Sequence, residues 1–136
     1  MAGEYFADFR DYLKALEARG KLHTWTRPVN KDSELMPLMR LQYRGLADDQ
    51  RQAFLYENVF DSRGKKHDLR VATGVYGSSR EIAALGLGCE QPLEIYEKWR
   101  NALAKPIEPR RVASAPIQEI VYSGEELKKF GVTGLP

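Results

Sequence analysis

The stretch TGVYGSSREIAALGLG (residues 73–88) joins two turns of small residues to a short apolar run, and its interpretation decides the fold. A β-prone segment, LRVATGVYG (69–77), leads into it, so the predicted order is strand, glycine-containing turn and helix. That order is typical of loops that bind a phosphate with the free N–H groups at a helix start. It is equally typical of an ordinary helix with a capped first turn.

The residues of this turn favour the capped helix. Gly74 and Gly77 do not form the GxGxxG pattern, and no Gly-Lys-Ser/Thr triplet follows them. Ser78 and Glu81 have the spacing of a capping box, in which the serine oxygen accepts from a backbone N–H and the glutamate accepts from another. We therefore expect Ser78 to cap a helix that ends near Gly86 and Gly88. Anion binding at the Ser78–Ser79 turn remains the alternative.

Upstream of this turn, periodicity predicts two helices and two strands. Phe6, Phe9, Leu13 and Leu16 recur at helical spacing, with Asp8 or a nearby residue as the cap and Gly20 as the end. KLHTWTRPV (21–29) alternates like a strand that Pro28 confines to an edge or terminates. A second helix is expected mostly after Met36, with Asp32 and Ser33 as cap candidates and Gly45 as the end, before a β-prone run at 52–60 and a loop at 61–68.

Downstream, a fourth helix is predicted over about 92–104, because Pro92 suits a helix start and apolar residues recur through it. These apolar positions are Leu93, Tyr96, Trp99, Ala102 and Leu103. Pro106 and Pro109 prevent its extension, so an extended connection follows. We expect a strand at 117–124 and one or two helical turns at 125–131. The alternation predicts an α/β (α+β) fold with a small mixed sheet flanked by helices.

Composition narrows the class of protein. The chain has 136 residues, 43% of them hydrophobic and 29% charged, which is typical of one globular domain. No apolar run approaches the roughly 20 residues that span a bilayer, so no membrane association is expected. The basic clusters at 63–67 and 108–111 are short and lack interleaved aromatic residues, so nucleic-acid binding is not expected either. Cys89 is the only cysteine, which precludes an internal disulfide and favours a cytoplasmic location.

No residue is assigned a catalytic, cofactor-binding or metal-binding role. His23 and His67 lack partners at metal-ligand spacing, and we expect the first on a sheet face and the second in a solvated loop. Cys89 is interpreted as structural. Glu57 and Asn58 end an apolar run, where a structural hydrogen bond to a neighbouring loop is expected. Trp25 and Trp99 are expected to supply core or interface bulk.

Several segments, in this order and at this spacing, resemble the start of the UbiD family of decarboxylases. They are FADFRDYLKALEARGKLHTWTRPVN (6–30), FLYENV (54–59) and GVYGSSREIAALGLG (74–88). The matching positions are Gly20–Leu22, Arg27–Val29, Glu57–Val59 and Gly74–Gly86. PIQEIVYSGEELKKFGVTGLP (116–136) is similar to the family's passage toward its middle domain.

The resemblance implies a division into an N-terminal α/β domain (1–105) and an extended connection (106–136) toward a flavin-binding middle domain that is missing here. It implies that the longer enzyme removes or adds carbon dioxide on an aromatic or α,β-unsaturated acid. It also implies prenylated FMN and a divalent metal as cofactors, bound by later domains, and a homo-oligomer. None of those catalytic or cofactor positions has a counterpart in this segment, and Leu135 and Pro136 resemble a cut edge. We therefore expect the segment alone to bind no cofactor and to be inactive.

Two other functions stay open at this point. The chain could be a free-standing accessory or scaffolding subunit that acts beside a separate catalytic chain. It could also be a small anion-binding module that uses the Ser78–Ser79 turn.

Overall fold

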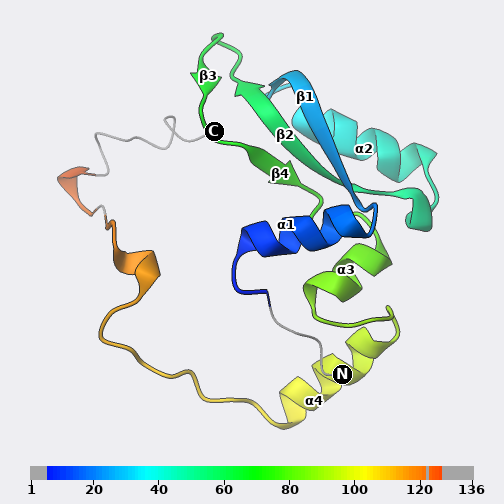
Figure 1. Cartoon of the computed structure of the whole chain (residues 1–136), viewed down its shortest axis with the longest axis vertical. Coiled ribbons are helices and arrows are strands. Elements are labelled where there is room, and N and C mark those ends of the chain that lie inside the picture. Colours follow the sequence, from blue (N-terminus) through cyan, green and yellow to red (C-terminus); the bar gives the residue numbers. More distant parts are fainter. Residues whose placement is uncertain (1–5, 122, 127–136) are drawn as a thin grey trace.

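Strand β2 (Ala53–Phe60) is the centre of a mixed sheet in this computed structural model, which describes residues 6–121 and 123–126. β1 (Leu22–Asn30) pairs with it in parallel, from Leu22 opposite Ala53 to Asn30 opposite Phe60. β3 (Lys66–His67) and β4 (Val71–Thr73) pair antiparallel with β2 (Figure 1). The predicted small mixed sheet of an α+β fold is confirmed.

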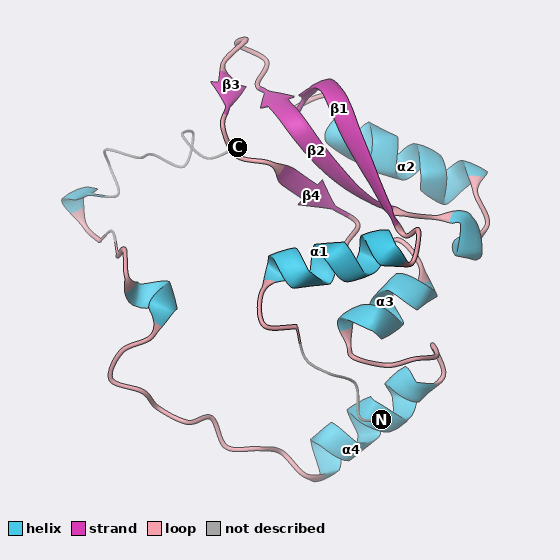
Figure 2. Cartoon of the chain, in the orientation of Figure 1, coloured by secondary structure: helices cyan, strands magenta, loops and turns pink. Residues whose placement is uncertain are grey.

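The helices flank this sheet and extend from one end of it (Figure 2). In chain order they are α1 (Phe9–Ala18), α2 (Leu35–Gly45), α3 (Arg80–Gly86) and α4 (Glu94–Ala104), with 3₁₀ turns η1 (Asp48–Gln50) and η2 (Pro116–Gln118). α2 lies beside β1 and β2, α1 and α3 lie below the sheet, and α4 lies beyond α3 (Figure 1).

Helix α1 forms as the sequence predicts. The Asp8 carboxylate accepts from the backbone N–H groups of Arg10 and Asp11 over 2.7 and 3.0 Å, which satisfies two of the free donors of the first turn. After the helix, Gly20 has a φ of +66°, a conformation that costs glycine little. The chain can therefore turn directly into β1.

The parallel pairing of β1 and β2 requires a crossover connection, and α2 supplies it. α2 begins at Leu35, so Pro37 lies in its opening turn, where a missing N–H is tolerated. The expected caps, Asp32 and Ser33, are wrong. Their own backbone N–H groups donate to the Asn30 side chain over 2.9 and 3.2 Å, so they belong to the turn before the helix.

Two hydrophobic clusters hold the layers together. One joins α2 to the sheet and contains Val29, Leu35, Met39, Phe54, Tyr56 and Val59. The other joins α1, α3 and the start of the sheet and contains Tyr12, Leu16, Ala53, Ile82 and Leu85. Burial of these side chains is the main stabilising contribution, at roughly 25 cal/mol per Å² of apolar surface.

The loop predicted at 61–68 contains strand β3, and this changes the environment of His67. His67 pairs with Val59 across the sheet and is only 6% exposed, so the expectation of a solvated loop position is wrong. Lys65 and Lys66 beside it are exposed, which is why the local sequence reads as solvated. The strand expected at 69–77 is shorter and covers only Val71–Thr73.

The strand predicted at 117–124 does not form in the part of it that the structure describes. Residues 116–118 make the 3₁₀ turn η2, and no strand pairs with the described residues that follow. Of the helical turns expected at 125–131, Glu125 and Glu126 are helical and the remaining residues lie outside the described range.

Candidate functional site

Helix α3, which follows the turn after β4, is capped by Ser79 and not by Ser78. Ser79 Oγ accepts from the Ile82 N–H over 3.2 Å, in the role of an N-cap. Ser78 is fully buried, and its hydroxyl has no hydrogen-bond partner among the described residues. The expected capping box at Ser78 and Glu81 is therefore wrong: the cap lies one position later, and Ile82 cannot return a side-chain bond. Glu81 instead pairs with Lys21 at 2.7 Å.

The start of α3 already binds a carboxylate from the same chain. Asp48 Oδ2, from η1, lies 3.2 Å from the Arg80 backbone nitrogen and 3.4 Å from its Nε. A carboxylate at this place is stabilised by the N–H groups and by the positive end of the helix dipole. A phosphate bound here would have to displace it. The geometry therefore disfavours the anion-binding alternative.

Tyr12 fixes α1 against this turn. Its hydroxyl donates to the Val75 carbonyl and also lies 3.1 Å from the Ile82 carbonyl. Tyr76 stacks on the Tyr12 ring with centroids 5.3 Å apart. Burial, together with the neighbouring Tyr76, raises the pKa of Tyr12 to about 12. The site is thus a rigid structural joint between α1, β4 and α3.

The other singled-out side chains also have structural surroundings. His23 is exposed on the sheet and contacts Trp25, with ring centroids 4.9 Å apart. The Asn58 side-chain amide donates to the Thr26 carbonyl over 2.7 Å, so the bond is structural, but its partner lies in strand β1 and not in a loop as predicted. Cys89 is buried just after α3. Trp25 packs against the sheet cluster, as expected.

The described residues do not fit the metal or the flavin that the family resemblance implies. In 6–121 and 123–126, no group of three or more His, Cys, Asp or Glu side chains is placed to hold a metal ion. The helix start that would suit a flavin phosphate holds Asp48. The surfaces described next are those on which apolar side chains stay uncovered.

Helix α4 is attached to the body at one edge. The Lys98 ammonium donates to the Leu87 carbonyl and lies 3.5 Å from the Gly88 carbonyl, just past the end of α3. The Glu94 carboxylate accepts from the Glu90 N–H over 2.9 Å, which closes the turn before α4. No residue of α4 is buried.

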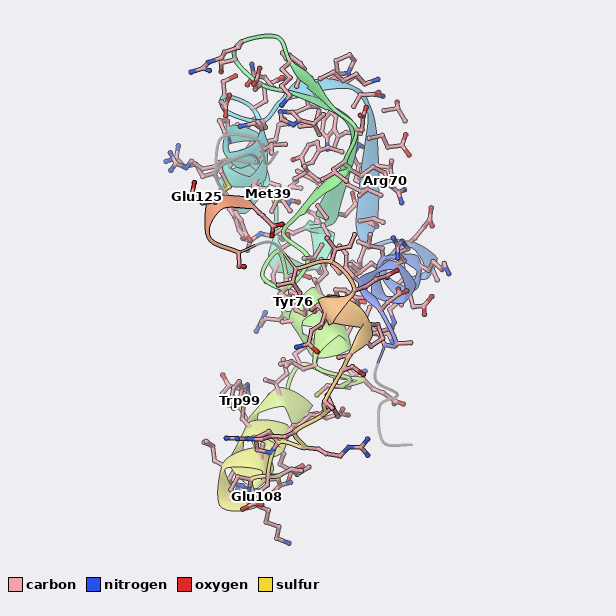
Figure 3. The ribbon with its side chains drawn as sticks, turned by 90° about the vertical axis from the view of Figure 1, so that its left-hand side faces the viewer. Met39, Arg70, Tyr76, Trp99, Glu108 and Glu125 are labelled. Carbon is pink, nitrogen blue, oxygen red and sulfur yellow. The ribbon has the colours of Figure 1, made fainter. Side chains whose placement is uncertain are left out.

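The predicted apolar stripe of α4 exists but is uncovered. Tyr96, Trp99 and Leu103, spaced three and four residues apart, are 77%, 57% and 76% exposed. We call these three residues the α4 seam. Figure 3 shows Trp99 at the end of the molecule away from the sheet. Large apolar side chains gathered in this way on one face mark an interaction surface.

A groove separates α4 from α3 and η1. Its volume is about 1080 Å³, and Ile95 and Trp99 form part of its α4 wall while Asp49 and Arg80 lie across it. A smaller hollow of about 260 Å³, lined by Leu87 and Ala102 among others, opens beside the same helix. Both hollows are open, so α4 is incompletely packed on both of its sides.

The chain after α4, residues 105–121, is a second uncovered surface, which we call the exit segment. It leaves the body in an extended path (Figure 1). Its apolar side chains are exposed, by 94% for Ile107, 90% for Ile117 and 68% for Ile120. The sequence predicted an extended connection but not the exposure of these side chains, because periodicity shows which side chains are apolar and not what covers them.

No helix in the described part of the chain is long and apolar enough to cross a membrane.

One family model matches the chain. It describes the 3-octaprenyl-4-hydroxybenzoate carboxy-lyase N-terminal domain and covers residues 13–103 of 136, from α1 almost to the end of α4. The match begins one residue after Tyr12, includes the α4 seam and ends before the exit segment. The chain belongs to the UbiD family and carries its carboxy-lyase N-terminal domain.

Proposed function

We propose that this chain is the N-terminal domain of an enzyme that removes or adds carbon dioxide on an aromatic or α,β-unsaturated carboxylic acid with prenylated FMN. The observation that carries the proposal is the family match over residues 13–103. The cofactor and its divalent metal belong, in this proposal, to a flavin-binding domain later in the polypeptide. The enzyme is cytoplasmic.

The domain's own task in this proposal is to support the flavin-binding domain. The exit segment supplies the contact, because it leads out of the matched region with Ile107, Ile117 and Ile120 uncovered. Covering an apolar side chain of this size contributes about 1.5 to 3 kcal/mol.

Activity measurements test this proposal. The 136-residue chain is incubated with prenylated FMN, a divalent metal and a panel of aromatic and α,β-unsaturated acids, and carbon dioxide release is measured. We expect none, while a polypeptide that continues through a flavin-binding domain should release it. Release by the 136-residue chain alone would overturn the assignment of all chemistry to later domains.

The reading frame tests the relation to a longer enzyme. A frame that continues past codon 136 into a flavin-binding region supports the proposal. A stop codon directly after Pro136 contradicts it and favours the accessory subunit acting beside a separate catalytic chain.

A further inference from the structure

The first part of the exit segment, residues 106–114, is not tied to the rest of the fold by polar bonds (Figure 1). Every residue in it is exposed, and no hydrogen bond or ion pair joins it to the rest of the described chain. The nearest backbone bonds join Lys105 to Asn101 before it and Gln118 to Ala115 after it. A protease binds its substrate as an extended strand, so this segment can enter a protease cleft without any other part of the domain unfolding.

Two adjacent arginines, Arg110 and Arg111, lie in the middle of this segment. Trypsin-like endopeptidases select the residue before the cleaved bond with a pocket that contains a carboxylate and accepts arginine or lysine. Lys105 is a poor substrate because Pro106 follows it, and proline has a rigid ring and no N–H. No other lysine or arginine occurs in 106–121. The bonds after the two arginines are therefore the cleavable bonds of the exit segment.

We propose that Arg110 and Arg111 form a processing site for an endopeptidase with an acidic specificity pocket. The reaction is hydrolysis of the peptide bond that follows one of the two arginines. Water adds across this bond, the C–N bond breaks, the arginine gains a carboxylate and the next residue gains an amino group. The chain supplies an extended backbone and two basic side chains, and the protease supplies the catalytic groups.

The denser basic cluster at 63–66 is closed to such a protease. The Asp61 carboxylate accepts from the backbone N–H groups of Arg63 and Lys65 over 2.9 and 2.8 Å. The Asp61 N–H also donates to the Lys65 carbonyl over 2.9 Å, and Lys66 is paired in β3. This turn must open before a protease can bind it as an extended strand, and only the open population is cut. Backbone structure, and not the density of basic residues, thus selects the exit segment.

Most other basic residues of the described chain have backbones that are already hydrogen-bonded. Those within regular helices and strands are Arg10, Lys14, Arg27, Arg40, Arg44, Arg80, Lys98 and Arg100. Those outside them that donate their backbone N–H to a carbonyl are Arg19, Lys21, Lys31 and Arg51. Arg70 lies in the short link between β3 and β4, which are both paired with β2. Each of these sites must lose structure before it can be cut.

Cleavage after Arg110 or Arg111 leaves the domain intact. Helices α1 to α4 and the strands of the sheet all precede Lys105. The buried apolar residues of the described chain lie between Tyr12 and Cys89. The domain is therefore released as a folded unit from the polypeptide that follows. Its separation from a flavin-binding domain rests on the proposed function, whereas the cleavage site itself does not.

Limited proteolysis of the 136-residue chain with trypsin tests this inference, with the products identified by intact mass. Lys128→Gln and Lys129→Gln are present throughout, because these residues lie outside the described range and would add cuts of their own. We expect the first cut after Arg110 or Arg111, before any cut in residues 6–105. The product should unfold within about 2 °C of the uncut chain, because the part removed contains none of the buried core residues.

Substitutions locate the site. Arg110→Gln with Arg111→Gln should slow the first cut at least about tenfold, because the remaining sites must open before they are cut. Arg110→Gln with Arg111→Lys should restore the cut, since the pocket also accepts lysine. Arg63→Gln with Lys65→Gln is the matched control in the closed cluster and should leave the rate of the first cut unchanged.

A first cut within residues 6–105, including the cluster at 63–66, would overturn the inference. A first cut that the double glutamine variant does not slow also overturns it, since the cleaved bond then lies elsewhere. A product that is unfolded would overturn the release of an intact domain. None of these outcomes bears on the decarboxylase assignment, which is tested by activity and by the reading frame.

Discussion

The side-chain amide of Gln42 forms two hydrogen bonds with the backbone of Gln52. Gln42 Nε2 donates to the Gln52 carbonyl over 2.7 Å, and the Gln52 N–H donates to Gln42 Oε1 over 2.9 Å. Gln42 is only 6% exposed, on the face of α2 that meets the body. Because Gln52 directly precedes β2, this pair ties the crossover helix to the start of the central strand.

Gln42→Leu should lower the free energy of unfolding by about 2 to 3 kcal/mol, because it leaves two backbone groups of Gln52 without their partner. Urea unfolding measures the change. Arg40→Leu, at an exposed position of the same helix, should stay within about 0.5 kcal/mol of the parent chain. Equal effects of the two substitutions would show that the Gln42 bonds contribute no specific stability.

Gly74→Ala should destabilise the protein more than Gly64→Ala. Both glycines have positive φ, at +71° and +81°, so both substitutions carry a backbone cost of about 1 kcal/mol. Only at Gly74 is the added Cβ crowded, since it would overlap with Ser78 Oγ and Met39 Cε, whereas nothing lies within 4 Å at Gly64. Crowding in a packed site typically adds about 1 to 3 kcal/mol.

Thermal unfolding of the two glycine variants measures this difference directly. The Gly64 variant is the control for the backbone conformation, since it has the same strain without the crowding. Equal melting temperatures would mean that Ser78 and Met39 move aside at no cost.

Ionisation of the Tyr12 hydroxyl should lower the free energy of unfolding at alkaline pH. Its pKa is about 12 in the folded chain against about 10 when unfolded, so the folded state holds the proton more tightly. The resulting stabilisation is complete below pH 10 and is lost as the pH rises through 12. Its full size is about 2 to 3 kcal/mol, at 1.36 kcal/mol per pKa unit.

Urea unfolding between pH 9 and 12 tests the contribution of Tyr12. Tyr12→Phe should flatten the decline, while Tyr43→Phe, at a 40% exposed position, should keep it. A decline that is unchanged in Tyr12→Phe would assign the alkaline loss to other groups.

Protonation of the Asp32 carboxylate should lower the free energy of unfolding at acidic pH. Hydrogen bonds from the Lys31 ammonium at 2.7 Å and from the Ser62 N–H at 2.9 Å hold its pKa at about 2. Its stabilisation is therefore present above about pH 4 and is lost as the pH falls through 2. Asp32→Asn should be less stable than the parent chain near pH 6, with a difference that shrinks toward pH 2 in urea unfolding. A difference that stays constant with pH would contradict this role.

Local sequence predicted the elements whose signals are local. The first helix follows from Asp8, from the apolar spacing and from Gly20, all of which act within a few residues of one another. The order of strands and helices also predicted the mixed sheet. The cap of α3 was wrong because Ser78 and Ser79 are chemically equivalent in sequence. Met39 and Gly74 pack around Ser78 in the fold, and this packing decides that Ser78 is the buried serine and Ser79 the cap.

Long-range contacts account for the other differences. His67 lies among exposed lysines in sequence, but pairing of β3 with Val59 buries it. The alternation at 117–124 resembles a strand, yet its described residues pair with no strand of the sheet. The exposed face of α4 likewise depends on contacts between distant parts of the chain. The apolar residues of α4 were visible in the sequence, but their exposure depends on what surrounds them.

Pro28 has a consequence for the behaviour of the protein in concentrated solution. Within the described residues β1 pairs only with β2, so its outer edge could accept a strand from another molecule and begin open-ended aggregation. A proline offers no N–H to an incoming strand, and the pairing register of β1 shifts between Trp25 and Pro28. The edge is thereby interrupted before its end. Pairing with β2 nevertheless continues past Pro28 to Asn30, so the proline blocks the free edge of β1 against open-ended growth without breaking the sheet.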